Sequence, residues 1–283
     1  KNKIDTFLHN PTDPHSISAN GITSILRTSS QHLLVGTFGG GLSIFNDDTG
    51  QFTNLSHNPN DPFSISNNNV MALFEDSLGL VWVGTEKGLN KFNSLSNSFD
   101  RFISDKNPQN ISSDIVWTFH EDINQSLWLG TRGGSLNRWD KTNRLNSQPI
   151  FHNFSENISL PSSNIYGIAS NSPDEIWISH NRGLTRFNPT TLATDHYGVR
   201  DGLQDMEFNL GAALSSKSGA IYFGGNRGYN VIKTDELSDV SVLPQVSVSA
   251  IKVMNQKRNF GAPYHTLEEL VLTHEDRMVS FEF

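Results

Sequence analysis

The sequence predicts an all-β protein, a β-propeller of four-stranded antiparallel blades, and two observations lead to this prediction. The first is a motif that returns along the chain: an apolar strand, a Gly-Thr or Gly-Gly step, and a second strand after a tight turn. Its marker residues are 45 to 49 positions apart, at Gly36, Gly84, Gly130, Ser179 and Gly224. The second is that each period holds only short apolar or alternating runs between Gly, Asn, Asp and Ser clusters. This pattern excludes helical repeats and favours β-blades.

One period illustrates how a blade is built. Its four predicted strands are residues 69–75, 80–84, 89–92 and 99–104. The first strand is largely apolar, as expected for a strand buried on both faces. The tight turn between the second and third strands ends in Gly88, which tolerates positive φ. Four antiparallel strands in about 45 residues are typical of a propeller blade.

The repeats predict five recognisable blades within residues 1–244. Their bounds are approximately residues 20–57, 69–104, 114–155, 164–200 and 209–235. Residues 4–9 resemble an outer fourth strand, with Phe7 aligned with Phe52, whereas the fifth blade shows only three strands. Two arrangements follow: the N-terminal strand completes the fifth blade and closes a five-bladed ring, or the five blades belong to a larger, seven-bladed ring.

Beyond residue 244 the repeat stops. Residues 246–253, 269–272 and 278–283 alternate as half-buried strands, and so few strands cannot bury a core. Residues 245–283 are therefore expected to begin a β-sandwich that is incomplete at Phe283. We expect residues 279–283 to present an unpaired apolar edge that pairs with another chain.

Composition excludes several classes of function. The 283 residues carry 21 basic and 29 acidic side chains, a net charge of -8 that argues against nucleic-acid binding. The chain has no Cys, which excludes disulfides and thiolate metal sites. Neither an 18-residue apolar run nor a signal peptide is visible, so a soluble piece is expected, with any export signal removed or outside this sequence.

Several segments together resemble a known family. The repeat combines Ser64-Ile65-Ser66 with a Glu-Asp-Ser-Leu-Gly-Leu-Val-Trp-Val-Gly-Thr run and a Gly-Leu-Asn-Lys-Phe-Asn hairpin strand. This combination resembles the two-component regulator propeller repeat. Residues 201–228 resemble the terminal blade of that family, and the tail resembles the start of its immunoglobulin-like Y_Y_Y domain.

The resemblance implies a periplasmic ligand-sensing region of an inner-membrane signalling protein, a histidine kinase or a diguanylate cyclase. Members commonly carry two seven-bladed propellers, the sandwich, a membrane helix and a cytoplasmic output domain. The expected partners are a small extracellular ligand, such as an oligosaccharide or an anionic solute, and a second subunit in the full-length protein. The chain departs from the pattern in its five blades, incomplete sandwich and missing output domain.

The motifs that suggest chemistry have simpler structural explanations. The Gly-Thr and Gly-Gly steps lead into hairpins and lack a phosphate-binding Gly-x-x-x-x-Gly-Lys-Ser/Thr run. The run His120-Glu121-Asp122 looks like a metal-ligand cluster, yet Glu75-Asp76 shows that Glu-Asp is the turn of the repeat. We therefore expect no metal, no cofactor and no catalysis here.

The tryptophans fall into two groups. Trp82, Trp128 and Trp177 hold one equivalent position and are expected to pack between blades. Trp117 and Trp139 break the pattern and are better candidates for ligand binding.

A ligand site is expected at the turns between second and third strands. These turns share a face with the long polar connections between blades, and loops carry function more often than the scaffold does. The candidate ligand-binding residues are Phe38, Glu86, Lys87, Trp117, Arg132, Asn181, Arg182, Asn226 and Arg227. Arg at such turns can bind carboxylate or sulfate and can stack on rings, but it can equally pair with a neighbouring blade.

An alternative is a propeller enzyme such as a polysaccharide lyase or a lactonase. Such an enzyme would need an axial metal or a cluster of His and carboxylates at the channel mouth. The positions that open the inner strands are Asn20, Asn69, Asp114, Asn164 and Asn209. One Asp among Asn side chains is a poor divalent-cation site, so the sensor interpretation is favoured.

Overall fold

The computed structural model describes residues 4–105, 107–146, 148–154, 158–233, 248–259 and 269–282. The chain divides into two compact units, residues 1–234 and 235–283. The predicted domain boundary at residue 244, residues 1–3 and Phe283 lie outside the described residues. Among those described, no helix is long and apolar enough to cross a membrane.

The first unit is a series of antiparallel sheets in which the strands follow chain order from the inside outward. Sheet 1 holds β1 (Ile22–Arg27), β2 (Leu33–Thr37), β3 (Gly41–Asn46) and β4 (Gln51–Leu55). Sheet 2 holds β5 (Val70–Glu75), β6 (Val81–Thr85), β7 (Gly88–Asn93) and β8 (Ser98–Phe102). Sheet 3 holds β9 (Val116–Glu121), β10 (Leu127–Thr131), β11 (Leu136–Trp139) and β12 (Phe151–Asn153). Sheet 4 holds β13 (Gly167–Ser172), β14 (Glu175–His180), β15 (Gly183–Phe187) and β16 (Thr194–Tyr197). Sheet 5 holds β17 (Phe208–Ser215), β18 (Ala220–Gly225) and β19 (Gly228–Lys233), preceded by the 3-10 turn η1 (Val199–Asp201).

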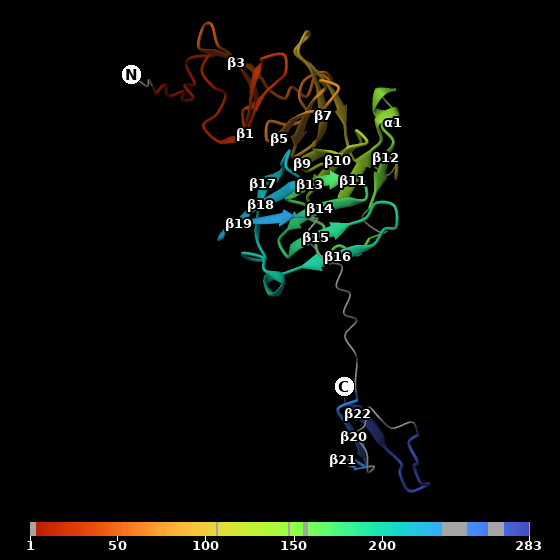
Figure 1. The fold of residues 1–283 in the computed structure, drawn as a ribbon. Helices are drawn as coiled ribbons and strands as arrows, with labels where there is room; N and C mark the ends of the chain where they lie inside the picture. The colour runs from red at the N-terminus through yellow and green to blue at the C-terminus, as the bar shows by residue number, and fades with distance from the viewer. Residues whose placement is uncertain are drawn as a thin grey trace. The chain divides into compact units, whose positions relative to one another are not determined.

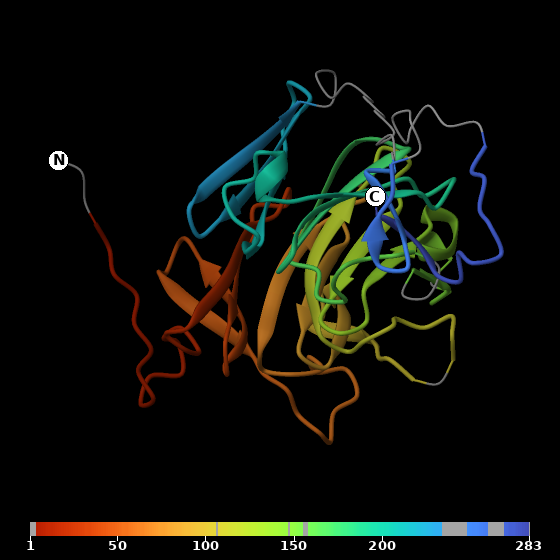
Figure 2. The same ribbon diagram turned by 90° about the horizontal axis from the view of Figure 1, so that it is seen from below.

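The sheets follow one another around a common centre (Figures 1 and 2). Their first strands, β1, β5, β9, β13 and β17, line a channel of about 560 Å³. An all-β fold of four-stranded antiparallel blades around a channel is the predicted propeller, and the predicted strand bounds in sheet 2 hold to within two residues.

A buried Asp ties the first strand of a sheet to its second. In sheet 2, Trp82 Nε1 donates to Asp76 Oδ2 at 2.8 Å, while Asp76 Oδ1 accepts the backbone N–H groups of Leu78 and Leu80, both at 3.0 Å. We call this arrangement the Asp–Trp clamp. Sheet 3 repeats it, since Trp128 Nε1 donates to Asp122 Oδ2 at 2.8 Å. The Glu-Asp run is thus a structural turn.

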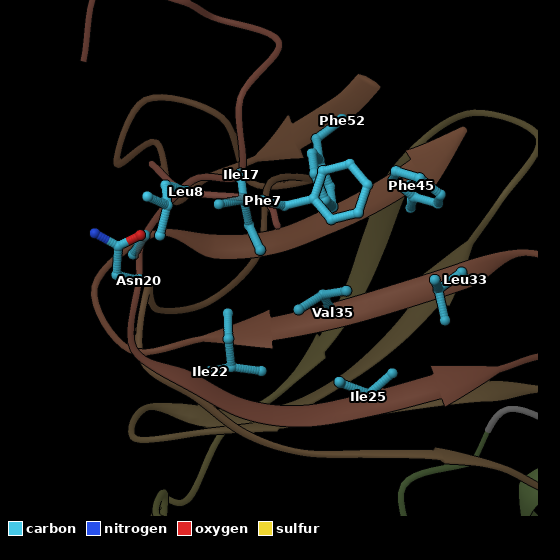
Figure 3. A pocket seen from close by; sticks show the side chains of 11 residues that line it. Phe7, Leu8, Ile17, Asn20, Ile22, Ile25, Leu33, Val35, Phe45 and Phe52 are labelled. Carbon is cyan, nitrogen blue, oxygen red and sulfur yellow. The ribbon is translucent and has the colours of Figure 1, made fainter. Parts of the chain in front are cut away.

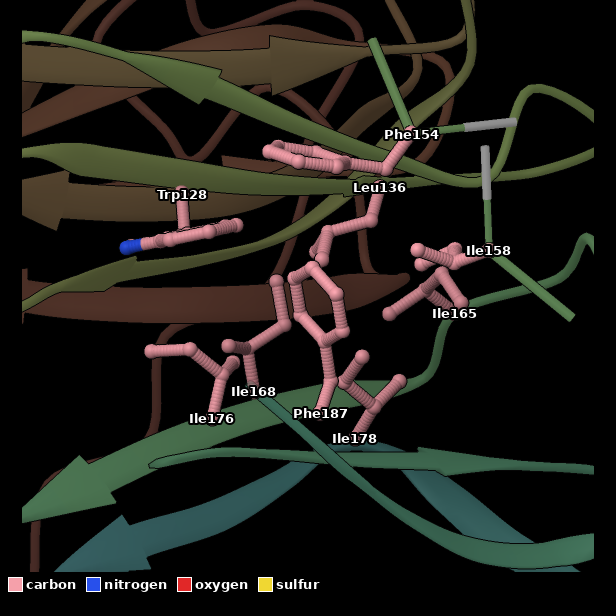
Figure 4. Packing of buried hydrophobic residues seen from close by; sticks show 9 residues of the cluster. All are labelled: Trp128, Leu136, Phe154, Ile158, Ile165, Ile168, Ile176, Ile178 and Phe187. Atoms are coloured by element: carbon pink, nitrogen blue, oxygen red, sulfur yellow. The ribbon is translucent and has the colours of Figure 1, made fainter. Parts of the chain in front are cut away.

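Adjacent sheets pack through apolar side chains. Trp128, Leu136 and Phe154 of sheet 3 face isoleucines and Phe187 of sheet 4 (Figure 4). The ring of Phe154 lies 5.5 Å from Trp128 and 5.2 Å from Phe187, centroid to centroid. Trp82, Trp128 and Trp177 are at most 1% exposed, in agreement with the predicted packing role.

One short helix interrupts the strands of sheet 3. The helix α1 (Lys141–Leu145) lies between β11 and β12. It buries the side chain of Arg144, whose guanidinium donates to Glu121 Oε1 at 2.7 Å and lies 3.5 Å from Asp76 Oδ2. Asp76 belongs to the turn after β5 and Glu121 to β9, so Arg144 links sheets 2 and 3.

The N-terminal segment also differs from its prediction. Residues 4–9 form no strand, and within the described residues sheet 5 has three strands, so the ring closure considered above does not occur here. Instead, Phe7 packs on Phe45 and Phe52 of sheet 1, with ring centroids 5.0 and 5.6 Å apart. The contacts of His9 with Asn20 and Ile17 repeat those of His57 with Asn68 and Ile65, which aligns Phe7 with Leu55, so its alignment with Phe52 is wrong.

The second unit holds a sheet in the order β21-β20-β22, made of β20 (Ala250–Val253), β21 (Gln256–Lys257) and β22 (Val279–Glu282). The strand expected at residues 269–272 does not form, since residues 269–273 are irregular in this described stretch. In the described residues, β22 is an edge strand of this sheet. Its predicted pairing with another chain stays a prediction.

The imidazole of His180 is another buried ionisable group, in sheet 4. It is fully buried at the end of β14 and accepts the backbone N–H of Arg182 through Nδ1 at 3.1 Å. Nε2 therefore carries the proton and donates to Thr185 Oγ1 at 2.9 Å. Burial, with smaller effects of His196 and Arg182, lowers the pKa of His180 to about 4.

The first prediction concerns the Asp–Trp clamp. Asp76→Ala leaves Trp82 Nε1 without its acceptor and removes one of two carboxylates beside buried Arg144, so we expect a loss of about 3 kcal/mol in unfolding free energy. Asp122→Ala removes only a clamp, so its loss of unfolding free energy should be smaller by about 1 kcal/mol. The exposed Asp48→Ala is the matched control, expected within about 0.5 kcal/mol of the parent. Urea unfolding measures all three, and equal stability of the Asp48 and Asp76 variants would contradict the assigned role.

The second prediction concerns pH. Because the folded pKa of His180, about 4, lies below its ordinary value of 6.5, the unfolded chain takes up a proton first, and stability present above pH 6.5 is lost as pH falls toward 4. From neutral pH to about pH 5 this loss is about 2 kcal/mol. His180→Thr, which installs the residue found at the equivalent Thr85, should remove that part of the loss. Urea unfolding at the two pH values tests this, and an identical loss in both proteins would refute it.

Candidate functional site

The turns between second and third strands lie beside the segments where inner strands begin. The backbone N–H of Glu86 donates to Asn69 O at 3.1 Å, and that of Arg132 donates to Ile115 O at 2.9 Å. Asn69 and Ile115 immediately precede β5 and β9. These turns therefore stand at one end of the channel, which we call the rim.

Four side chains form a connected group at the rim, which we call the rim cluster: Trp117, Arg132, Tyr166 and Glu207. The guanidinium carbon of Arg132 lies 5.7 Å from the centroid of the Trp117 ring. The Trp117 ring lies 5.6 Å from that of Tyr166, at an interplanar angle of 50°. Tyr166 in turn donates its hydroxyl to Glu207 Oε1 at 3.3 Å. The cluster thus spans β9 and the turn after β10 in sheet 3, the residue before β13 and the segment before β17.

The electrostatics of the rim cluster keep Tyr166 neutral. Burial and the charge of Glu207 raise the pKa of Tyr166, and the more distant Arg132 opposes this only in part. The phenol therefore keeps its proton at neutral pH and remains a hydrogen-bond donor. Arg132 is exposed, and Trp117, Tyr166 and Glu207 are half-buried, so solvent reaches the group.

Of the residues predicted from sequence, the structure brings Trp117 and Arg132 together. Glu86 lies at the same end, where Asn69 Nδ2 donates to its Oε2 at 2.6 Å. Phe38, 54% exposed, makes an isolated backbone bridge with Asn69. These contacts place Phe38 and Glu86 at the rim beside sheets 1 and 2.

The other predicted residues stand apart. Arg227 Nε lies 3.3 Å from Asp205 Oδ2 on the connection before sheet 5, so it forms an ion pair outside the rim cluster. Among the residues that the structure describes, no hydrogen bond, ion pair or ring contact joins the remaining candidates to the rim cluster. These candidates are Lys87, Asn181, Arg182 and Asn226.

Sequence reasoning missed Tyr166 and Glu207, although a signal for Tyr166 exists. Tyr166 follows the apolar Ile165 near the start of the inner strand, as Trp117 follows Val116 and Met71 follows Val70. The residue after the opening residue varies between sheets, and Thr23, Met71, Trp117 and Gly211 at this position line the channel. Glu207 lies in an irregular connection, where no repeat marks it.

Two other suspected sites are structural. Trp139 is fully buried, packed 4.6 Å from Phe151 and 5.3 Å from Trp82 between ring centroids, so its candidacy for binding is wrong. The side chains of His120, Glu121 and Asp122 point to different partners: Ser170, Arg144 and Trp128. In the described residues, no group of three or more His, Asp or Glu could hold a metal ion.

His120 lines the channel as a neutral group. Its Nε2 lies 2.9 Å from Ser170 Oγ, and burial lowers its pKa to about 4 despite the opposing charges of Asp122 and Glu121. The channel is thus lined mainly by apolar and uncharged side chains, whereas the rim cluster carries a cation, Arg132, and a carboxylate, Glu207.

The rim cluster can recognise a ligand in two ways at once. The indole and phenol rings offer flat apolar surfaces, and Arg132 and Glu207 offer charged hydrogen-bonding groups. Such a combination suits a polar molecule that has one apolar face, or an anion that the guanidinium can bind.

Comparison with known proteins identifies the repeat. Residues 64–87 match the family model of the two-component regulator propeller. The chain is 30% identical to histidine kinase P4 of Formosa agariphila over 230 residues. The aligned part is 80% of this chain and 16% of the length of that kinase.

Solved structures share the fold. The extracellular domain of BT4673 from B. thetaiotaomicron, assigned to the hybrid two-component systems, matches 86% of this chain and 31% of its own at a TM-score of 0.66 and 20% identity. YCF48 from Cyanidioschyzon merolae matches 82% of this chain and 73% of its own at a TM-score of 0.55 and 13% identity. The family match, the histidine kinase relative and the propeller geometry agree, and the chain is a propeller region built from two-component regulator propeller repeats.

Proposed function

We propose that this chain is the extracytoplasmic ligand-sensing region of a membrane-bound two-component histidine kinase. The similar histidine kinase supports this output over a diguanylate cyclase. The similar solved structure is an extracellular domain, which supports a location outside the cytoplasm, here the periplasm. The region itself binds and does not catalyse.

One observation carries the site: Arg132 lies 5.7 Å over the Trp117 ring at the mouth of the channel. A ligand with a ring face can stack on Trp117 while Arg132 binds its carboxylate or sulfate. The Tyr166 ring adds a second flat surface beside it, and its hydroxyl, which donates to Glu207, keeps an oxygen that can accept a hydrogen bond. The proposed ligand is therefore an oligosaccharide or another small solute that carries an anionic group.

No observation favours the lyase or lactonase alternative. Within the described residues, the His, Asp and Glu side chains form no cluster fit for a metal. The one His in the channel, His120, is held by Ser170 in a buried environment.

The third prediction tests the site with a panel of carboxylated, sulfated and neutral oligosaccharides, using titration calorimetry and indole fluorescence. We expect a carboxylated or sulfated member to bind, and Arg132→Ala to weaken that binding by about tenfold because a charge-assisted hydrogen bond is lost. Trp117→Ala should weaken it similarly through lost stacking.

The matched controls are Arg182→Ala and Lys87→Ala, which remove exposed cations from turns outside the rim cluster. Both should bind nearly as the parent does. Unchanged binding in the double variant Arg132→Ala/Arg182→Ala would remove the basis of the proposed site.

A further inference from the structure

The cavities of the structure differ in the charge that they offer to a ligand. Among the described residues, the groove beside sheet 1, about 310 Å³ in volume, is lined without any charged side chain, by groups such as Phe7, Phe45 and Phe52 (Figure 3). The rim cluster differs from it in carrying charges of both signs. Its contacts run from Arg132 through two aromatic rings to Glu207, so the cation and the carboxylate stand at opposite ends of the cluster.

The cation of the rim cluster has no counter-ion in the described part of the chain. Arg132 is exposed, and its guanidinium carbon lies 5.7 Å from the centroid of the Trp117 ring, but it forms no ion pair with any Asp or Glu described. By contrast, Arg227 lies 3.3 Å from a carboxylate oxygen of Asp205. An indole face holds a guanidinium in place and leaves its N–H groups available to an anion.

The carboxylate of the rim cluster also lacks a counter-ion. Within the described residues, Glu207 pairs with no Lys, Arg or His, and its one side-chain hydrogen bond comes from the Tyr166 hydroxyl to Oε1 at 3.3 Å. The side chain is half-buried, so water solvates its charge only in part. A cation that reaches Glu207 would therefore form a favourable ion pair.

The rings between the two charges fix how a ligand can lie. The centroids of Trp117 and Tyr166 are 5.6 Å apart and the ring planes make an angle of 50°, so two linked rings of a ligand can contact one aromatic ring each. When the anionic end of such a ligand binds Arg132, its other end lies toward Glu207. A second anion there would meet a like charge, whereas an ammonium group would meet its counter-ion.

We propose that the rim cluster binds a zwitterionic ligand, with a carboxylate or sulfate at Arg132, ring faces on Trp117 and Tyr166, and an ammonium group at Glu207. An acidic sugar linked to an amino sugar with a free amine has this chemistry. The assignment rests on the proposed sensing function and narrows its class of ligand. It makes Glu207 a specificity-determining residue, which selects against ligands whose amine is acetylated or sulfated.

The test uses three disaccharides of a hexuronic acid and glucosamine that differ only in the amine, which is free, acetylated or sulfated. Each is titrated by calorimetry, at a slightly acidic pH that keeps the amine protonated, into the chain and into Glu207→Gln. This variant removes the charge and keeps an acceptor for the Tyr166 hydroxyl. Glu86→Gln is the matched control, because it neutralises a rim carboxylate outside the rim cluster. Arg132→Ala reports whether the disaccharides occupy the proposed site.

We expect the parent chain to bind the free-amine disaccharide about tenfold more tightly than the acetylated one, because the ammonium forms a charge-assisted hydrogen bond with Glu207. Glu207→Gln should remove this preference, and Glu86→Gln should keep it. The sulfated disaccharide should bind the parent most weakly and should bind Glu207→Gln more tightly than the parent, because the repulsion between like charges is lost. A purely structural role of Glu207 would not produce changes of opposite sign.

Equal binding of the free-amine and acetylated disaccharides, with Arg132→Ala weakening both, overturns the zwitterionic ligand and leaves the proposed sensing site in place. A preference for the free amine that persists in Glu207→Gln overturns the role assigned to Glu207. Failure of all three disaccharides to bind also overturns the zwitterionic ligand. Binding that Arg132→Ala leaves unchanged overturns the proposed site as well.

Discussion

The packing of each sheet on the next is the constraint on which the rest of this structure depends. A single four-stranded sheet has two apolar sides and cannot bury either alone. Stability therefore comes from the packing of Trp82, Trp128 and their equivalents against apolar residues of the following sheet. An indole at this depth needs a partner for its N–H. The Asp–Trp clamp supplies it in sheets 2 and 3 and closes the turn with the same carboxylate. Sheet 4 departs from this, since Trp177 Nε1 is buried and has no hydrogen-bond partner among the described residues.

The same constraint leaves few positions free to change. Residues that face another sheet are fixed by packing, whereas one equivalent position near the start of each inner strand varies, and in four sheets it lines the channel. That position holds Thr23, Met71, Trp117, Tyr166 and Gly211 in the five sheets. Two neighbouring sheets place aromatic rings there, and Arg132 and Glu207 add charge beside them. A recognition site can therefore differ between members of such a family while the stacked sheets stay alike.

Much of the fold could be predicted because the repeat supplies its own alignment. The spacing from Gly36 to Gly224 predicted the sheets and their order. Trp117 was selected because it breaks the tryptophan pattern, and Arg132 because the turn between the second and third strands varies between blades. The features that were not predicted lie in segments where the repeat offers no equivalent residue to align. The helix α1 is an insertion stabilised by contacts of Arg144 to distant carboxylates. Glu207 sits in an irregular connection, and Phe7 was misaligned because apolar residues alone fixed its register, without the contacts of His9.

The most direct test of this account is hydrogen exchange at the indole N–H groups, followed by nuclear magnetic resonance. The chain has five tryptophans, so each resonance can be assigned by single substitution. The Asp–Trp clamp predicts that Trp82 and Trp128 exchange slowest, through opening of the sheets, and that half-buried Trp117 exchanges fastest. Exchange at Trp82 and Trp128 as fast as at Trp117 would contradict the claim that clamped, stacked tryptophans hold the sheets together.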